Sequence, residues 1–125
     1  MSDNEKMFNF ISWDDNAPTQ ADITTASGTF NFVVGKVSRQ DREKILEGYD
    51  LKKFAKVFED EELMKTCECL FANNLNVSRA ATLLYMHRNT LIYRLKKLKR
   101  TIGLDLCDFY QAIIFKILYI FYCEK

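Results

Sequence analysis

The chain has 125 residues, 48% of them apolar and 28% charged; this balance excludes disorder of the whole chain and fits one ordinary domain with a short extension. The longest apolar stretch is too short for a membrane span and is interrupted by Gln111 and Lys116, and the acidic N-terminus lacks the basic start of a signal peptide, so we expect a cytoplasmic protein. The net charge of +1 is unevenly spread: residues 1–68 sum to −5, residues 69–104 to +7 without one acidic residue, and residues 105–125 to −1.

Residues 1–49 are predicted to form an N-terminal extension. Within it, Thr29–Val37 is rich in β-branched and aromatic residues, which favour a strand. The apolar segment Met7–Trp13 could be its partner. Residues 14–28 lie between the two and contain a proline and several Thr and Ser, which is typical of a loop. The extension could therefore contain a β-hairpin.

Helical periodicity begins at Ser38, near the end of the extension. The second predicted region, the helical domain, covers residues 50–125. Ser38 can cap a helix over roughly residues 39–47, still within the extension, and Asp50 can cap one over residues 51–58. The acidic run that follows suits the first turn of a further helix, because the helix macrodipole favours negative charge there.

The four cysteines match no disulfide framework or metal site. Cys67 and Cys69 are separated by one residue, whereas structural zinc pairs usually have two to four residues between them, and the only histidine is His87. Cys107 and Cys123 stand apart from them. We therefore expect reduced thiols, no metal and no cofactor.

The acid-free block, residues 69–104, is predicted to hold a pair of helices. Ser78 can cap a short helix, in which small Ala80 and Ala81 allow close packing. A tight connection leads to a longer basic helix that ends at Gly103. Its inward stripe is spaced i, i+4, i+7, i+11 and consists of Leu91, Leu95, Leu98 and Ile102. A short helix, a turn and a longer basic helix form a helix-turn-helix, whose second helix enters the major groove of DNA.

The outer surface of this helix pair has the side chains that DNA recognition requires. Arginine can bind guanine with two hydrogen bonds and asparagine can bind adenine in the same way. We expect Thr90, Arg94 and Lys97 opposite the leucine stripe, with Tyr93 beside them, and Lys96, Lys99 and Arg100 placed for phosphate or solvent. The candidate DNA-binding residues are Ser78, Arg79, His87, Arg88, Asn89, Thr90, Tyr93, Arg94 and Lys97.

Three of these residues also have simpler interpretations. Asn89 could cap the helix, since asparagine is a favoured cap. Tyr93 could be a half-buried packing residue, and His87 could be a turn residue without a contact.

The last helix, which Asp105 or Asp108 could start, is apolar on nearly all sides. A helix of this kind must be buried on most of its surface. Either residues 1–58 cover it or a second chain does. We favour a homodimer, because operators are commonly two-fold and a dimer would present two recognition helices one DNA turn apart.

Four strings of this region carry a family resemblance: ELMKT at 62–66, NVSRAA at 76–81, HRNTLIYRLKKL at 87–98 and GLDL at 103–106. On these strings the chain resembles the C-terminal helix-turn-helix domain of PucR-type and carbohydrate-diacid-regulator-type bacterial transcription factors. The resemblance implies a mainly α fold, a Fis-like helical bundle without a wing, for residues 50–125. Such regulators usually carry long sensory domains, and residues 1–49 could be the remnant of one.

The function expected is sequence-specific binding of double-stranded DNA and regulation of transcription in the bacterial cytoplasm, with an effector that is not apparent. The alternative is a protein-interaction module, or a truncated regulator that dimerises with full-length relatives without binding DNA itself. An enzyme is not expected, because no nucleophile–base pattern, phosphate-binding glycine loop or paired metal ligands occur.

Overall fold

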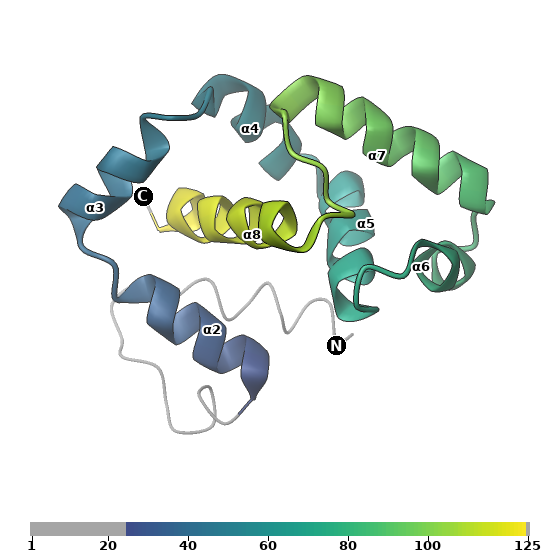
Figure 1. The fold of residues 1–125 in the computed structure, drawn as a ribbon, viewed down its shortest axis with the longest axis horizontal. Helices are drawn as coiled ribbons and strands as arrows, with labels where there is room; N and C mark the ends of the chain where they lie inside the picture. Colours follow the sequence, from purple (N-terminus) through teal and green to yellow (C-terminus); the bar gives the residue numbers. More distant parts are fainter. Residues whose placement is uncertain (1–24, 125) are drawn as a thin grey trace. The chain divides into compact units, whose positions relative to one another are not determined.

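The computed structural model describes residues 25–124, and within this range the chain forms seven α-helices and no strand (Figure 1). The mainly α fold is therefore confirmed for this part of the chain. The helices are α2 (Ala26–Gly35), α3 (Arg39–Leu46), α4 (Leu51–Phe58), α5 (Glu61–Ala72), α6 (Val77–Leu83), α7 (Arg88–Ile102) and α8 (Phe109–Cys123).

The chain divides into two compact units. One comprises Asp50–Lys116, and the other comprises the residues up to Tyr49 together with those from Ile117 onward. The candidate DNA-binding residues all lie in the unit formed by Asp50–Lys116, so that unit is described in more detail below.

Several helices begin and end where local capping signals predict. The Ser38 hydroxyl accepts a hydrogen bond from the Asp41 backbone N–H at 3.1 Å and begins α3. The Asp50 carboxylate accepts from the Lys52 N–H at 3.1 Å and begins α4. Gly103 ends α7 with a φ of 81°, a left-handed conformation that glycine adopts without a steric penalty. The predicted helices over 39–47 and 51–58 are thus confirmed.

The predicted strand over residues 29–37 is wrong, because residues 26–35 form α2. Thr25 caps this helix by accepting a hydrogen bond from the Gly28 N–H at 3.0 Å. Phe30, Val34 and Val37 follow at helical spacing and pack with Ile120 and Phe121 of α8. Burial of this helical face outweighs the weak strand preference of the individual residues. The suggested partner strand, residues 7–13, lies outside the described residues.

The short helix α6 is capped by Asn76 rather than by Ser78. The Asn76 side-chain oxygen accepts from the Arg79 backbone N–H at 3.0 Å, and α6 begins at Val77. Ser78 therefore lies in the first turn of the helix, where its hydroxyl is available for another partner.

We expect Asn76→Ala to lower the free energy of unfolding by about 1 kcal/mol, because it removes the cap of α6. Ser78→Ala, two residues further along in the first turn of α6, is the matched control and should change the free energy of unfolding by less than about 0.5 kcal/mol. Urea denaturation followed by circular dichroism measures both. Equal losses for the two variants would contradict the assignment of the cap.

The core of the unit Asp50–Lys116 lies between α4, α5, α7 and the first half of α8. The predicted stripe of α7 is buried at all four positions, Leu91, Leu95, Leu98 and Ile102. Phe115 of α8 contacts Phe58 with ring centres 5.4 Å apart and Phe71 with ring centres 5.9 Å apart. Close to these rings, the buried Glu68 carboxylate accepts a hydrogen bond from the Lys116 ammonium group. Burial of these four side chains fixes the position of α7 in the unit and leaves its opposite face exposed.

Helix α8 begins at Phe109, and Asp108 just before it accepts a hydrogen bond from the Gln111 N–H at 3.1 Å through its carboxylate. Much of the apolar surface of α8 is covered by the chain itself, since Phe115, Ile120 and Phe121 are all buried. No helix in residues 25–124 combines the length and the apolar character that crossing a membrane requires.

Candidate nucleic-acid interface

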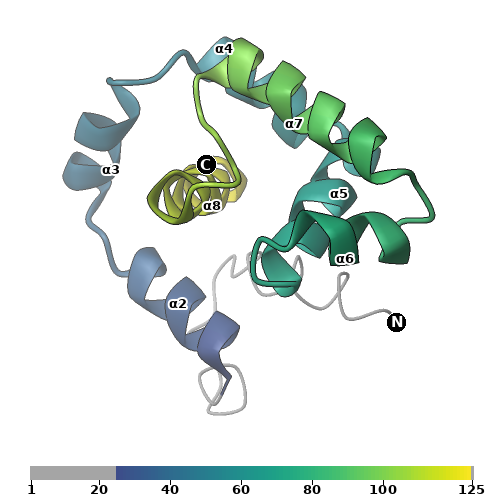
Figure 2. The ribbon, with the colours of Figure 1, turned by 45° about the vertical axis from the view of Figure 1, so that its right-hand side comes forward.

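The helix-turn-helix is formed by α6 and α7, which pack directly against each other (Figure 2). Ala80 and Ala81 are almost completely buried, which lets the two helices approach closely. The chain turns at Tyr85, whose φ of 55° lies in the left-handed region that few large side chains adopt. The Met86 N–H then donates to the Ala81 carbonyl at 3.0 Å and closes the turn.

His87 is the N-cap of α7. Its Nδ1 atom accepts a hydrogen bond from the Asn89 backbone N–H at 3.0 Å. The interpretation of Asn89 as the cap is therefore wrong, and the Asn89 side chain is exposed in the first turn of the helix. His87 therefore has a structural role at the start of α7.

The exposed face of α7 can be located from its buried side. Because successive residues of an α-helix are separated by about 100°, the positions farthest from the leucine stripe are Asn89, Tyr93 and Arg100, with Lys96 and Lys97 on either side of them. Tyr93 is 61% exposed, so it is not a half-buried packing residue. Neither α6 nor α7 contains an acidic residue. The face is therefore positively charged and carries polar groups at its N-terminal end.

Two arginines at this end are oriented by neighbouring side chains. Arg88 Nε donates to the Ser78 hydroxyl at 2.9 Å, and Arg79 Nε donates to the side-chain oxygen of Asn73 at 2.9 Å. Both bonds use Nε and leave the two terminal amino groups of each guanidinium group available for a ligand. Ser78 thus positions Arg88, a role that the sequence alone did not indicate.

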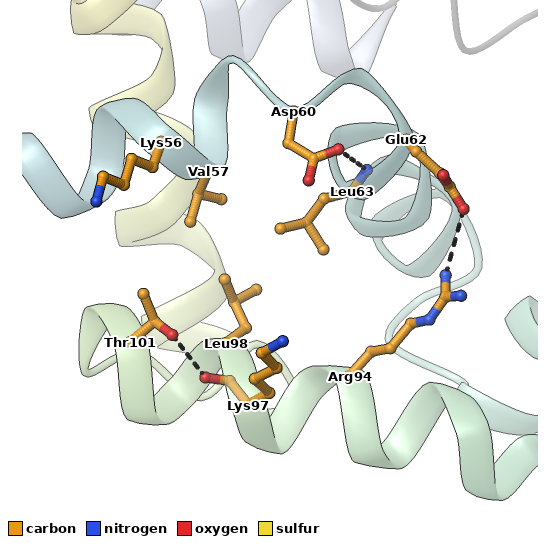
Figure 3. A pocket seen from close by; sticks show the side chains of 9 residues that line it. All are labelled: Lys56, Val57, Asp60, Glu62, Leu63, Arg94, Lys97, Leu98 and Thr101. Atoms are coloured by element: carbon orange, nitrogen blue, oxygen red, sulfur yellow. Dashed lines mark hydrogen bonds and ion pairs between the residues drawn. The ribbon is translucent and has the colours of Figure 1, made fainter.

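Arg94 lies on the flank of α7 that faces α5, and not on the outermost line of the helix. Its Nη1 is 3.6 Å from Glu62 Oε1, and its side chain is 40% exposed while that of Glu62 is 82% exposed. Figure 3 shows the guanidinium group extended toward Glu62. The predicted arrangement of Thr90, Arg94 and Lys97 opposite the leucines is therefore revised: Arg94 is paired at the edge. An ion pair this exposed contributes at most about 1 kcal/mol, so a phosphate could displace it.

Arg94 and Lys97 line a groove of about 370 Å³ between α4, the start of α5 and α7. Lys56 and Val57 of α4 form the opposite side (Figure 3). Lys56 was not among the residues predicted from the sequence, because only the packing of α4 on α7 brings it beside the basic helix.

Cys67 and Cys69 are buried in α5, and burial raises the pKa of both thiols. Cys107 and Cys123 are exposed. Among residues 25–124, no three His, Cys, Asp or Glu side chains gather in a way that could hold a metal ion.

We expect Ser78→Ala to weaken binding of a specific duplex by roughly two- to tenfold, because Arg88 loses the hydrogen bond that orients it. Fluorescence anisotropy with labelled duplex measures this effect. Thr82→Ala is the matched control, because its exposed hydroxyl on the same helix donates to the Ser78 carbonyl and to no other group among residues 25–124. A larger loss for Thr82→Ala than for Ser78→Ala would contradict the role of Ser78.

Comparison with known protein families gives a match over part of the chain. Residues 63–118 match the model of the PucR C-terminal helix-turn-helix domain. This range contains α6, α7, most of α5 and the first part of α8. No solved structure matches significantly.

Three curated relatives, all from Bacillus subtilis strain 168, match over part of the chain. The proline-responsive transcriptional activator PutR is 44% identical over 48 residues, 38% of this chain and 12% of the relative. The purine catabolism regulatory protein is 36% identical over 74 residues, 52% of this chain and 14% of the relative. The uncharacterized protein YxkF is 36% identical over 55 residues, 44% of this chain and 18% of the relative. The chain thus spans less than a fifth of the length of these relatives.

Proposed function

We propose that the PucR-type C-terminal helix-turn-helix domain, which residues 63–118 constitute, binds specific sequences of double-stranded DNA and thereby regulates transcription. The domain family is one of transcription regulators and not of enzymes. The observation that carries the proposal is the exposed face of α7: its leucine side is buried, and its outer side bears polar and basic groups without an acidic residue.

In this proposal the N-terminal end of α7 enters the major groove and α6 crosses the backbone. The free terminal amino groups of Arg88 are suited to the two acceptors of guanine, and the Asn89 amide is suited to adenine. Thr90 and Tyr93 follow on the same helix and contact neighbouring bases or their sugars. Arg79, at the start of α6, contacts a phosphate.

The remaining candidates act at the edge of this contact. Arg94 and Lys97 bind backbone phosphates on the flank of α7 that faces α5, and His87 and Ser78 hold the first turn of α7 and Arg88 in place. Phosphate contacts fix the orientation of the protein, and base contacts provide sequence selectivity.

We further propose that the protein acts in the cytoplasm of a bacterium as a homodimer on a two-fold operator, with residues 1–49 as an N-terminal extension of a DNA-binding domain at 50–125. The words proline and purine in the names of two relatives describe those proteins. For this chain we propose only the DNA-binding activity of the shared domain.

Selection from a random pool of duplexes tests this function. The full chain should enrich a defined motif, and its affinity for that motif should exceed that for unrelated duplex and fall steeply with salt. Two inverted half-sites would support the dimer, whereas a single half-site would refute it. No enrichment, together with binding to a full-length relative in a pull-down, would favour the alternative of an interaction module.

A further inference from the structure

The groove beside α7 is lined both by residues of the matched range 63–118 and by residues of α4, a helix that precedes this range. Helix α4 ends at Phe58, before the first matched residue, yet it packs on α7. Lys56 comes from α4 on one side of the groove and Lys97 from α7 on the other (Figure 3). Two further lysines of α4, Lys52 and Lys53, are also exposed. The basic surface of α7 therefore continues onto α4.

The two carboxylates of this groove already have partners. Asp60 caps α5 by accepting a hydrogen bond from the Leu63 N–H at 3.1 Å, and Glu62 pairs with Arg94. Within the described part of the chain, neither Lys56 nor Lys97 has an ion-pair partner of its own. Two unpaired ammonium groups from different helices, on the two sides of one groove, form a surface suited to a polyanion.

The position of Lys97 along α7 indicates which part of DNA Lys97 and its neighbour Lys56 would meet. Lys97 follows Arg88 by nine residues, or about 13 Å along the helix axis. The major groove is about 12 Å wide, so when the first turn of α7 is in the groove, groups about 13 Å further along reach its phosphate rim. Lys56 packs beside that end of the helix.

We propose that α4 is part of the DNA interface, and that Lys56, together with Lys97, binds the sugar–phosphate backbone beside the groove that α7 enters. The inference rests on the proposed function and extends the interface beyond the matched residues 63–118. The contact is with phosphate, so it adds affinity for duplex DNA of any sequence and does not contribute to selectivity.

The test is a salt titration of duplex binding by the full chain, measured by fluorescence anisotropy on the selected motif and on an unrelated duplex. Lys56→Gln should lower the affinity for both duplexes by the same factor, roughly threefold at physiological salt. It should also reduce the slope of log K against log salt by about 1. Lys56→Arg, which retains the charge, should restore affinity and slope.

Lys65→Gln is the matched control, because Lys65 is exposed on α5 of the same unit and does not line the groove. It should leave the salt slope unchanged. If the wild-type chain binds DNA and Lys56→Gln behaves like Lys65→Gln, the inference is overturned while the proposed function stands. A loss confined to the selected motif would likewise overturn the phosphate role. If the wild-type chain binds no duplex at all, the proposed function itself fails.

Discussion

Replacement of Lys116 by alanine is expected to lower the free energy of unfolding by about 3–5 kcal/mol, the largest effect on stability that we predict for a single residue. The Lys116 ammonium group donates a hydrogen bond to Glu68, whose carboxylate is completely buried in α5. The second carboxylate oxygen has no hydrogen-bond partner among the described residues. Without Lys116, a buried carboxylate would be left without its cation. Urea denaturation at neutral pH measures the loss.

The control for this prediction replaces both partners. Glu68→Leu with Lys116→Met removes the two charges together and should be close to wild type in stability, or more stable, because an apolar pair avoids the cost of burying ions. If Lys116→Ala cost less than about 1 kcal/mol, the buried pair would not contribute as we describe.

Replacement of both Arg88 and Asn89 by alanine is expected to have the largest effect on DNA binding. Each well-made pair of hydrogen bonds to a base contributes about 1–3 kcal/mol of discrimination, so the double variant should lose about 2–6 kcal/mol on the selected motif, at least roughly 30-fold in affinity. Binding to unrelated duplex should change far less, because only one positive charge is removed. Fluorescence anisotropy titrations with both duplexes give the ratio of the affinity for the selected motif to the affinity for unrelated duplex.

Stability is the check on that experiment. Arg88 and Asn89 are exposed at the start of α7, so the free energy of unfolding of the double variant should be within about 0.5 kcal/mol of the wild-type value. An unchanged ratio between the selected motif and unrelated duplex would mean that neither side chain recognises a base.

Local sequence signals predicted much of the described fold. Ser38 and Asp50 begin helices as expected, and Gly103 ends α7, because capping depends on residues within one turn. The buried stripe of α7 was predictable because four apolar residues at helical spacing define one face whatever packs on it.

The features that sequence did not predict depend on contacts between distant residues. Phe30 and Val34 favour a strand by composition, but they are helical and pack with α8, nearly ninety residues away. Arg94 was expected to point outward, yet it pairs with Glu62, more than thirty residues earlier in the chain. Lys56 joins the basic surface only through the packing of α4 on α7. Periodicity within one helix carries no information about such partners.

The most direct test of the central claim is a titration of the nitrogen-15-labelled full chain with the selected duplex, followed by amide chemical shifts. If the outer face of α7 enters the groove of DNA, the largest shifts will be at residues 87–97 and at the start of α6. Shifts confined to α2, α3 and α8, with α7 unperturbed, would contradict the account.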